Sequence, residues 1–188
     1  MAVCAARARI DFLMTGNEAS MRRQIERAFI HLRRSIIVDS DTAVRWQTAF
    51  AQVRAEEACE GLGAVHLLQH GIWAFKANSP GERTDLVMGH QPVDLEEAER
   101  SAEAMALTEW KIARTQSDVN PQVQHAFTQA SIYAGSSLAG FELSTIRYLV
   151  IVSEDRMHMP EDRRLGDILY RVINVPVRPS TPSASRAT

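Results

Sequence analysis

Residues 146–154, IRYLVIVSE, constrain the fold of this chain more than any other segment. The run is almost continuously apolar, and its length suits a β-strand. A strand with apolar side chains on both sides must be covered on both faces. The segment therefore predicts an α/β fold, in which helices flank a central sheet.

Two helices are expected before the sheet. Residues 18–37 repeat apolar side chains with the period of a helix, and the repeating positions are Met21, Ile25, Phe29, Leu32 and Ile36. The residues DSD at 39–41 interrupt this pattern, and Asp41 is expected to cap a long second helix over residues 42–69. Gly71 is the expected stop signal after that helix.

Three strands are predicted next. Residues 71–79 and 83–89 flank a turn at Pro80-Gly81, which indicates a hairpin. Residues 105–113, MALTEWKIA, predict the third strand. We expect the three to form a meander, in which the second and third strands lie side by side.

The later part of the chain completes the predicted sheet. Asn120-Pro121 is expected to begin a helix, because proline suits the first helical position. That helix leads into the strand at 146–154, so this strand should be parallel to the third one. The segment MPEDRR that follows predicts a loop. Residues 167–177 predict a last strand, and Pro176 favours its place at a sheet edge. The sheet is therefore expected to be mixed.

Composition limits the class of protein. A hydrophobic content of 45% is ordinary for a globular protein, and a net charge of −2 is not that of a strong nucleic-acid binder. No run approaches the roughly 18 apolar residues of a membrane span, so we expect no membrane association. Cys4 and Cys59 lie far apart and show no metal or redox spacing, which favours a reduced, cytoplasmic protein.

Basic residues are unevenly distributed. Seven arginines make the first 35 residues basic, namely Arg7, Arg9, Arg22, Arg23, Arg27, Arg33 and Arg34. They can contact phosphates, or they can form a solvated helix face. Among the 21 basic residues only Lys76 and Lys111 are lysines. Lysine is a compact charge whose pKa can shift, whereas arginine is a planar and permanent cation, so each lysine raises a chemical question.

Three residues of the predicted sheet suggest a site for phosphate chemistry. Glu109 and Lys111 alternate along the third strand and share one face. Asp85 lies on the expected neighbouring strand, so Asp85 and Glu109 can share a divalent cation such as Mg²⁺, which prefers carboxylate oxygens. A cation and an ammonium group together can position a water and stabilise charge on a phosphate. This set therefore suits hydrolysis of a phosphodiester.

The same residues resemble a family signature. Asp85 and Glu109-Trp110-Lys111 are similar to the D…(D/E)-x-K signature of the PD-(D/E)XK nuclease superfamily, although Thr84 stands where the family name has a proline. The order of predicted elements resembles the αβββαβ core of that restriction endonuclease-like fold. Gln129 and Tyr133 resemble the Q-x-x-x-Y motif of RecB-like members. The resemblance covers about residues 42–154.

The resemblance implies a metal-dependent nuclease that uses Mg²⁺ or Mn²⁺. Asp85 and Glu109 would bind the metal, and Lys111 would orient the attacking water. Gln129 and Tyr133 would position the site or the substrate. DNA is favoured over RNA as the usual family substrate, and defence or repair as the setting. The family often adds a glutamate from the first core helix. Glu56, Glu57 and Glu60 are the candidates here, and Glu60 is our choice.

The implied organisation is an N-terminal helical extension over residues 1–40, a nuclease-like domain over 41–177 and a disordered tail over 178–188. Two alternatives stay open. The chain can be an inactive subunit of the same fold that binds nucleic acid or assembles with a protein partner or with itself. Glu109 and Lys111 can also be an ordinary exposed ion pair, worth about 0–1 kcal/mol.

Two further features allow more than one interpretation. Lys76 can contact a phosphate, or it can be an exposed strand lysine. His66 and His70 are four residues apart, a spacing that can bind zinc. The sequence offers them no third ligand, and one of them can line the nuclease cleft instead.

Overall fold

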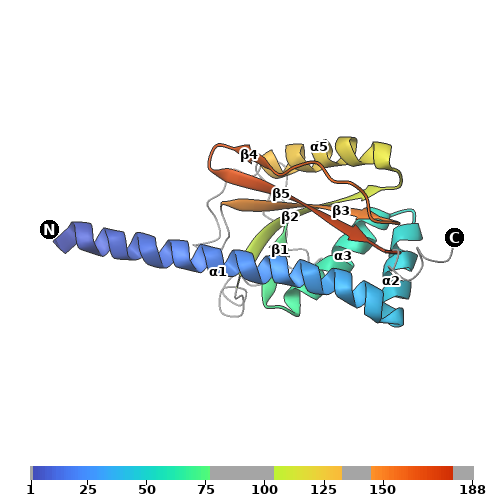
Figure 1. Cartoon of the computed structure of the whole chain (residues 1–188), viewed down its shortest axis with the longest axis horizontal. Helices are drawn as coiled ribbons and strands as arrows, with labels where there is room; N and C mark the ends of the chain where they lie inside the picture. The colour runs from blue at the N-terminus through green and yellow to red at the C-terminus, as the bar shows by residue number, and fades with distance from the viewer. Residues whose placement is uncertain (1, 77–103, 133–144, 180–188) are drawn as a thin grey trace.

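The structure is a computed structural model, which describes residues 2–76, 104–132 and 145–179, with side chains from residue 18 onward (Figure 1). It confirms an α/β fold with a mixed five-stranded sheet flanked by helices. The elements are α1 (Ala2–Val38), α2 (Ser40–Ala51), α3 (Ala55–Leu68), β1 (Ile72–Phe75), β2 (Ala104–Ala113), α5 (Gln116–Ile132), β3 (Ile146–Ser153), β4 (Arg163–Leu165) and β5 (Ile168–Pro176). None of the helices in these ranges contains a stretch long and apolar enough to cross a bilayer.

The strand order is β1-β2-β3-β5-β4. All pairs are parallel except β4 with β5, which is antiparallel. The central strand β3 is buried along its whole length, as its apolar sequence predicts. The predicted parallel pairing of β2 and β3 across α5 is also confirmed.

Helices cover both faces of the sheet (Figure 1). On one face α1, α2 and α3 form a core with the sheet, which includes Phe29, Trp46, Trp110 and Val150. On the other face α5 packs against Leu107 and its neighbours. The five apolar positions predicted for residues 18–37 are all buried, so the second half of α1 belongs to the same core as the sheet. The first half of α1 extends beyond the sheet (Figure 1).

The prediction of one long helix over residues 42–69 is wrong, because α2 and α3 are separate. Gln52 leaves the helical conformation at φ −70° and ψ 159°, and the side chain of Val53 is fully exposed. A straight helix of that length would span about 42 Å, longer than strands of eight to ten residues. The break lets Phe50 and Leu67 enter one core. The stop signal at Gly71 is confirmed, with φ 70°.

The N-cap of α2 also lies two residues before the predicted position. Asp39, not Asp41, is the N-cap, and its carboxylate accepts hydrogen bonds from the backbone N–H groups of Asp41 and Thr42. Asp39 has the extended backbone that an N-cap residue requires, at φ −114° and ψ 111°. Asp41 lies inside the first turn, where its negative charge suits the positive end of the helix dipole.

The meander predicted for the first three strands is wrong in its strand order. β1 pairs directly and in parallel with β2, from Ile72 opposite Ala104 to Phe75 opposite Leu107. No strand can therefore lie between them. Parallel neighbours require a crossover of about a dozen residues or more, and residues 77–103 are long enough to supply one. The strand predicted at 83–89 lies outside the described residues.

Two boundaries in the second half also differ from the predictions. α5 begins at Gln116, four residues before Asn120, so Pro121 lies inside the helix. The Asp118 carboxylate accepts hydrogen bonds from the backbone N–H groups of Arg114 (3.0 Å) and Thr115 (2.8 Å), which fixes the earlier start.

The strand predicted over residues 167–177 is confirmed as β5, but the end of the predicted loop before it forms the short strand β4, so β5 is not the edge strand of the sheet. Pairing with β4 ends at Tyr170. Beyond that residue β5 is hydrogen-bonded on one side only among the described strands. Pro176 is tolerated there because it lacks an N–H group to donate to a second neighbour.

Candidate active site around Glu109 and Lys111

Strand β2 places Glu109 and Lys111 on one face of the sheet, as the period of a strand predicts. Leu107 and Ala113 share that face and belong to the core under α5, whereas Trp110 belongs to the core on the opposite face. Glu109 is 4% exposed and Lys111 is 2% exposed. The two residues are therefore not an exposed surface ion pair. Burial of charged groups is costly unless they are paired, so this arrangement needs partners.

Among the described strands, none adjoins the β1-side edge of β2 beside these residues. Pairing with β1 ends at Leu107, and no described strand pairs with that edge of β2 from Thr108 onward. Lys111 lies in this stretch. Its ammonium group reaches α3 and donates a hydrogen bond to Glu56 Oε1. The end of β1 thus leaves the space in which a strand residue and a helix residue meet.

Helix α3 contributes two acids from one side. Glu56 and Glu60 are four residues apart, which places them one turn above each other. Lys111 pairs with Glu56, and Lys76 Nζ pairs with Glu60 Oε2 at 3.3 Å. Both lysines of the chain therefore contact α3. The structure brings together Lys111, Glu60 and Lys76, which the sequence singles out, and adds Glu56, which the sequence offers only as an alternative to Glu60.

The four charges form one electrostatic cluster. Burial raises the pKa of the Glu60 carboxyl, and the nearby Glu56 carboxylate raises it further. The ammonium groups of Lys76 and Lys111 oppose this rise. Glu60 is therefore a carboxyl group whose charge depends on nearby cations.

A glycine sets the distance between α3 and β2. A Cβ atom built on Gly63 would lie 2.2 Å from Cη2 and Cζ2 of Trp110. Trp110 lies between Glu109 and Lys111 in the sequence, so its side chain is on the opposite face of the sheet. There its indole packs against α3. Sequence reasoning did not select Gly63. The sequence feature that could have revealed Gly63 is a glycine inside a helical segment, which often marks close packing.

Gln129 lies on α5, which covers the face of the sheet that carries Glu109. Its Oε1 atom is buried and has no hydrogen-bond partner in the described part of the chain. Asp85 and Tyr133 lie outside the described residues. Among the residues described, no three His, Cys, Asp or Glu side chains are grouped so that they could hold a metal ion. Among the acids that the structure describes, Glu60 and Glu109 are the buried ones.

Arg147 is a buried cation that sequence reasoning missed. It lies on β3 and is 5% exposed. Its Nη1 atom donates to the backbone oxygen of Ala130 and to Tyr170 Oη, the latter at 3.1 Å. The sequence feature that could have revealed Arg147 is a charged residue inside the otherwise apolar strand at 146–154. Arg147 fastens α5 to the sheet near Gln129 and so helps to fix that helix over the site.

No protein-family model, curated protein or solved structure matches this chain. The geometry alone therefore defines the class: an α/β protein with buried acidic and basic residues on a parallel strand, beyond the point where its described neighbour β1 ends.

Proposed function

We propose that this protein is a metal-dependent nuclease of the PD-(D/E)XK type, which hydrolyses phosphodiester bonds in DNA. One observation supports this most strongly. Both lysines of an arginine-rich chain pair with acids on one side of α3, and Lys111 lies buried two residues from the buried Glu109. A solvated ion pair needs neither burial nor a lysine. A hydrolytic site needs both an acid and a compact cation.

The roles follow from the chemistry of the side chains. Glu60 and Glu109, with Asp85, supply the hard oxygen ligands that Mg²⁺ or Mn²⁺ prefers. A bound metal of this kind neutralises phosphate charge and makes water a better nucleophile. Lys111 orients the water and stabilises negative charge on the phosphate. Glu56 holds the Lys111 ammonium group in place and is a positioning residue. Gln129 contributes from α5, and Tyr133, four residues later in the sequence, is proposed to act with it.

The test is cleavage of DNA and of RNA with Mg²⁺ or Mn²⁺ by the wild-type protein and by Glu109→Ala and Lys111→Ala. Loss of one catalytic group typically costs about 10²- to 10⁴-fold in rate, and we expect losses in this range. Glu57→Ala is the matched control, because Glu57 is an exposed residue of α3 that pairs only with Arg54 among the interactions described. Cleavage that survives both Glu109→Ala and Lys111→Ala would refute the proposal.

A second function is favoured by the ion pairs themselves. Lys111 and Lys76 each have a carboxylate partner already, so the cluster is stable as a purely structural element. The chain would then be an inactive subunit that binds nucleic acid or a protein partner. Calorimetric titration with Mn²⁺ separates the two functions. Binding that is lost in Asp85→Ala and Glu109→Ala supports the nuclease, whereas absence of Mn²⁺ binding supports the subunit.

A further inference from the structure

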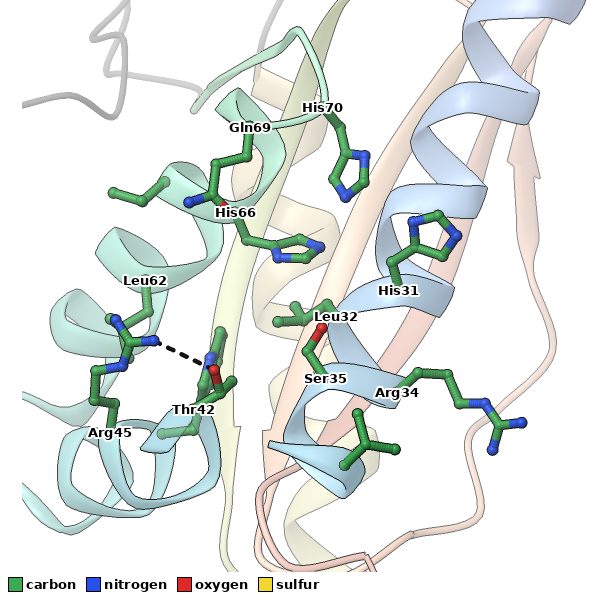
Figure 2. Close-up of a pocket in the computed structure, with 13 residues that line it drawn as sticks. His31, Leu32, Arg34, Ser35, Thr42, Arg45, Leu62, His66, Gln69 and His70 are labelled. Atoms are coloured by element: carbon green, nitrogen blue, oxygen red, sulfur yellow. Dashed lines mark hydrogen bonds between the residues drawn. The ribbon is translucent and has the colours of Figure 1, made fainter. Parts of the chain in front are cut away.

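A separate cavity of about 570 Å³ lies between α1, α2 and α3 (Figure 2). Small-molecule sites commonly have volumes of about 300–1,000 Å³. The second half of α3 and the turn after it line the cavity between Leu62 and His70, whereas the acids of the candidate active site lie earlier in that helix, at Glu56 and Glu60. The cavity is therefore distinct from the site around Lys111.

Three histidines surround this cavity. His31 comes from α1, His66 from α3, and His70 from the turn that follows α3 (Figure 2). The ring centre of His70 lies 5.1 Å from that of His31 and 4.9 Å from that of His66. The zinc spacing of His66 and His70 does not produce a metal site, since the described residues contain no group of three suitable ligands. If the three histidines bind a ligand, that ligand is therefore not a metal ion held by three such side chains.

The tautomer of His66 is fixed by the backbone. Its Nε2 atom lies 3.0 Å from the carbonyl oxygen of Ala28, which can only accept, so Nε2 carries a hydrogen. A second proton must therefore bind at Nδ1. Burial lowers the pKa of His66 and of His70, and neighbouring histidines lower both further. Protonation of this cluster consequently needs an anion nearby to compensate.

The remaining lining suits an anion with an apolar part. Arg34 and Arg45 lie at its rim, and none of the described residues that line it is acidic. Arg45 Nη2 donates to Thr42 Oγ1 at 3.3 Å (Figure 2). Asp39 follows the lining residue Val38 in the sequence, but its carboxylate is already bound to the Thr42 hydroxyl and to two backbone N–H groups. Leu62 and Trp46 provide apolar walls.

We propose that this cavity binds a small phosphorylated molecule, whose phosphate lies among His31, His66 and His70 and whose body contacts the apolar walls. Imidazolium groups donate charge-assisted hydrogen bonds to the oxygens of a phosphate. Binding takes up protons at the histidines and is therefore stronger at pH 6 than at pH 8. Besides the histidines, the charged residues that line the cavity are Arg34 on α1 and Arg45 on α2, and no other charged residue of α3 belongs to the described lining.

The test is isothermal titration calorimetry with adenosine monophosphate and inorganic phosphate as probes, and adenosine as the uncharged control. We expect both phosphates to bind at millimolar concentration or below, and adenosine to bind at least tenfold more weakly than the monophosphate. His31→Gln combined with His70→Gln should weaken binding by about 10- to 100-fold, the effect of removing charged hydrogen bonds. His125→Gln, an exposed histidine of α5, is the matched control and should bind as the wild type does.

Three results would overturn the proposal. The first is absence of binding of either phosphate at pH 6, and the second is equal binding of adenosine and the monophosphate. The third is loss of binding in Lys111→Ala with retention in the double histidine variant, because the nucleotide would then occupy the candidate active site. Retention of phosphate binding in Lys111→Ala supports binding in the cavity, even if the protein cleaves no nucleic acid. Circular dichroism of each variant checks that it is folded.

Discussion

Gly63 offers a quantitative test of how α3 is held against the sheet. In Gly63→Ala the new methyl carbon would lie 2.2 Å from two carbons of Trp110, well inside the contact distance of about 3.5–4.0 Å. The Trp110 side chain is 1% exposed, so the ring cannot move without disturbing the core. Either α3 or Trp110 must shift by more than about 1 Å.

The magnitude follows from two opposing effects. Overpacking of a core typically costs about 1–3 kcal/mol, and the size of this overlap places Gly63→Ala at the upper end. Alanine gains about 1 kcal/mol over glycine inside a helix. We therefore expect the free energy of unfolding to fall by about 2 kcal/mol, which is about 4–8 °C in Tm for a chain of this length.

Gly61 provides the matched control in the same helix. A Cβ atom at Gly61 meets nothing within 4 Å. Gly61→Ala should therefore raise the free energy of unfolding by about 1 kcal/mol, so the two variants should differ by about 3 kcal/mol. Urea unfolding measures both. Trp110→Leu removes the ring atoms that clash, so it should cost less in the Gly63→Ala background than alone. Equal effects of Gly61→Ala and Gly63→Ala would refute the close contact.

Three further predictions concern single side chains. Lys111→Arg should lower the free energy of unfolding by about 1–3 kcal/mol, because a larger guanidinium replaces an ammonium group on a side chain that is only 3% exposed. Lys76 is partly exposed, so Lys76→Arg should change the free energy of unfolding by less than about 0.5 kcal/mol in thermal denaturation. Asp39→Ala should cost about 1 kcal/mol through loss of the α2 cap, and Asp41→Ala clearly less; a larger loss for Asp41→Ala in urea unfolding would contradict the assigned cap. Because the pKa of His66 is lowered in the folded state, the unfolded state binds more protons, so the stability from neutral His66 is present above about pH 6.5 and is lost as the pH falls below it. His66→Gln should reduce the loss of stability between about pH 7.5 and about pH 5.5, and an unchanged loss would contradict the buried neutral histidine.

Part of the site could be derived from the sequence. The two-residue period of a strand requires Glu109 and Lys111 to share a face, and the structure confirms this. That period does not indicate which partner Lys111 meets. Glu56 lies 55 residues earlier, on a helix whose approach depends on Gly63 fitting beneath Trp110. Asp85 and Tyr133 stay predictions, since both lie outside the described residues.

The sequence by itself determined the elements whose pattern is local. The apolar run of β3, the helical period of α1 and the glycine at position 71 act through the geometry of neighbouring residues. Only the tertiary structure decided the break between α2 and α3, the direct pairing of β1 with β2 and the meeting of two lysines with two acids of α3. These features depend on which apolar surfaces, distant in the sequence, pack against each other. That choice is made among whole helices and strands, so the pattern of adjacent residues does not reveal it.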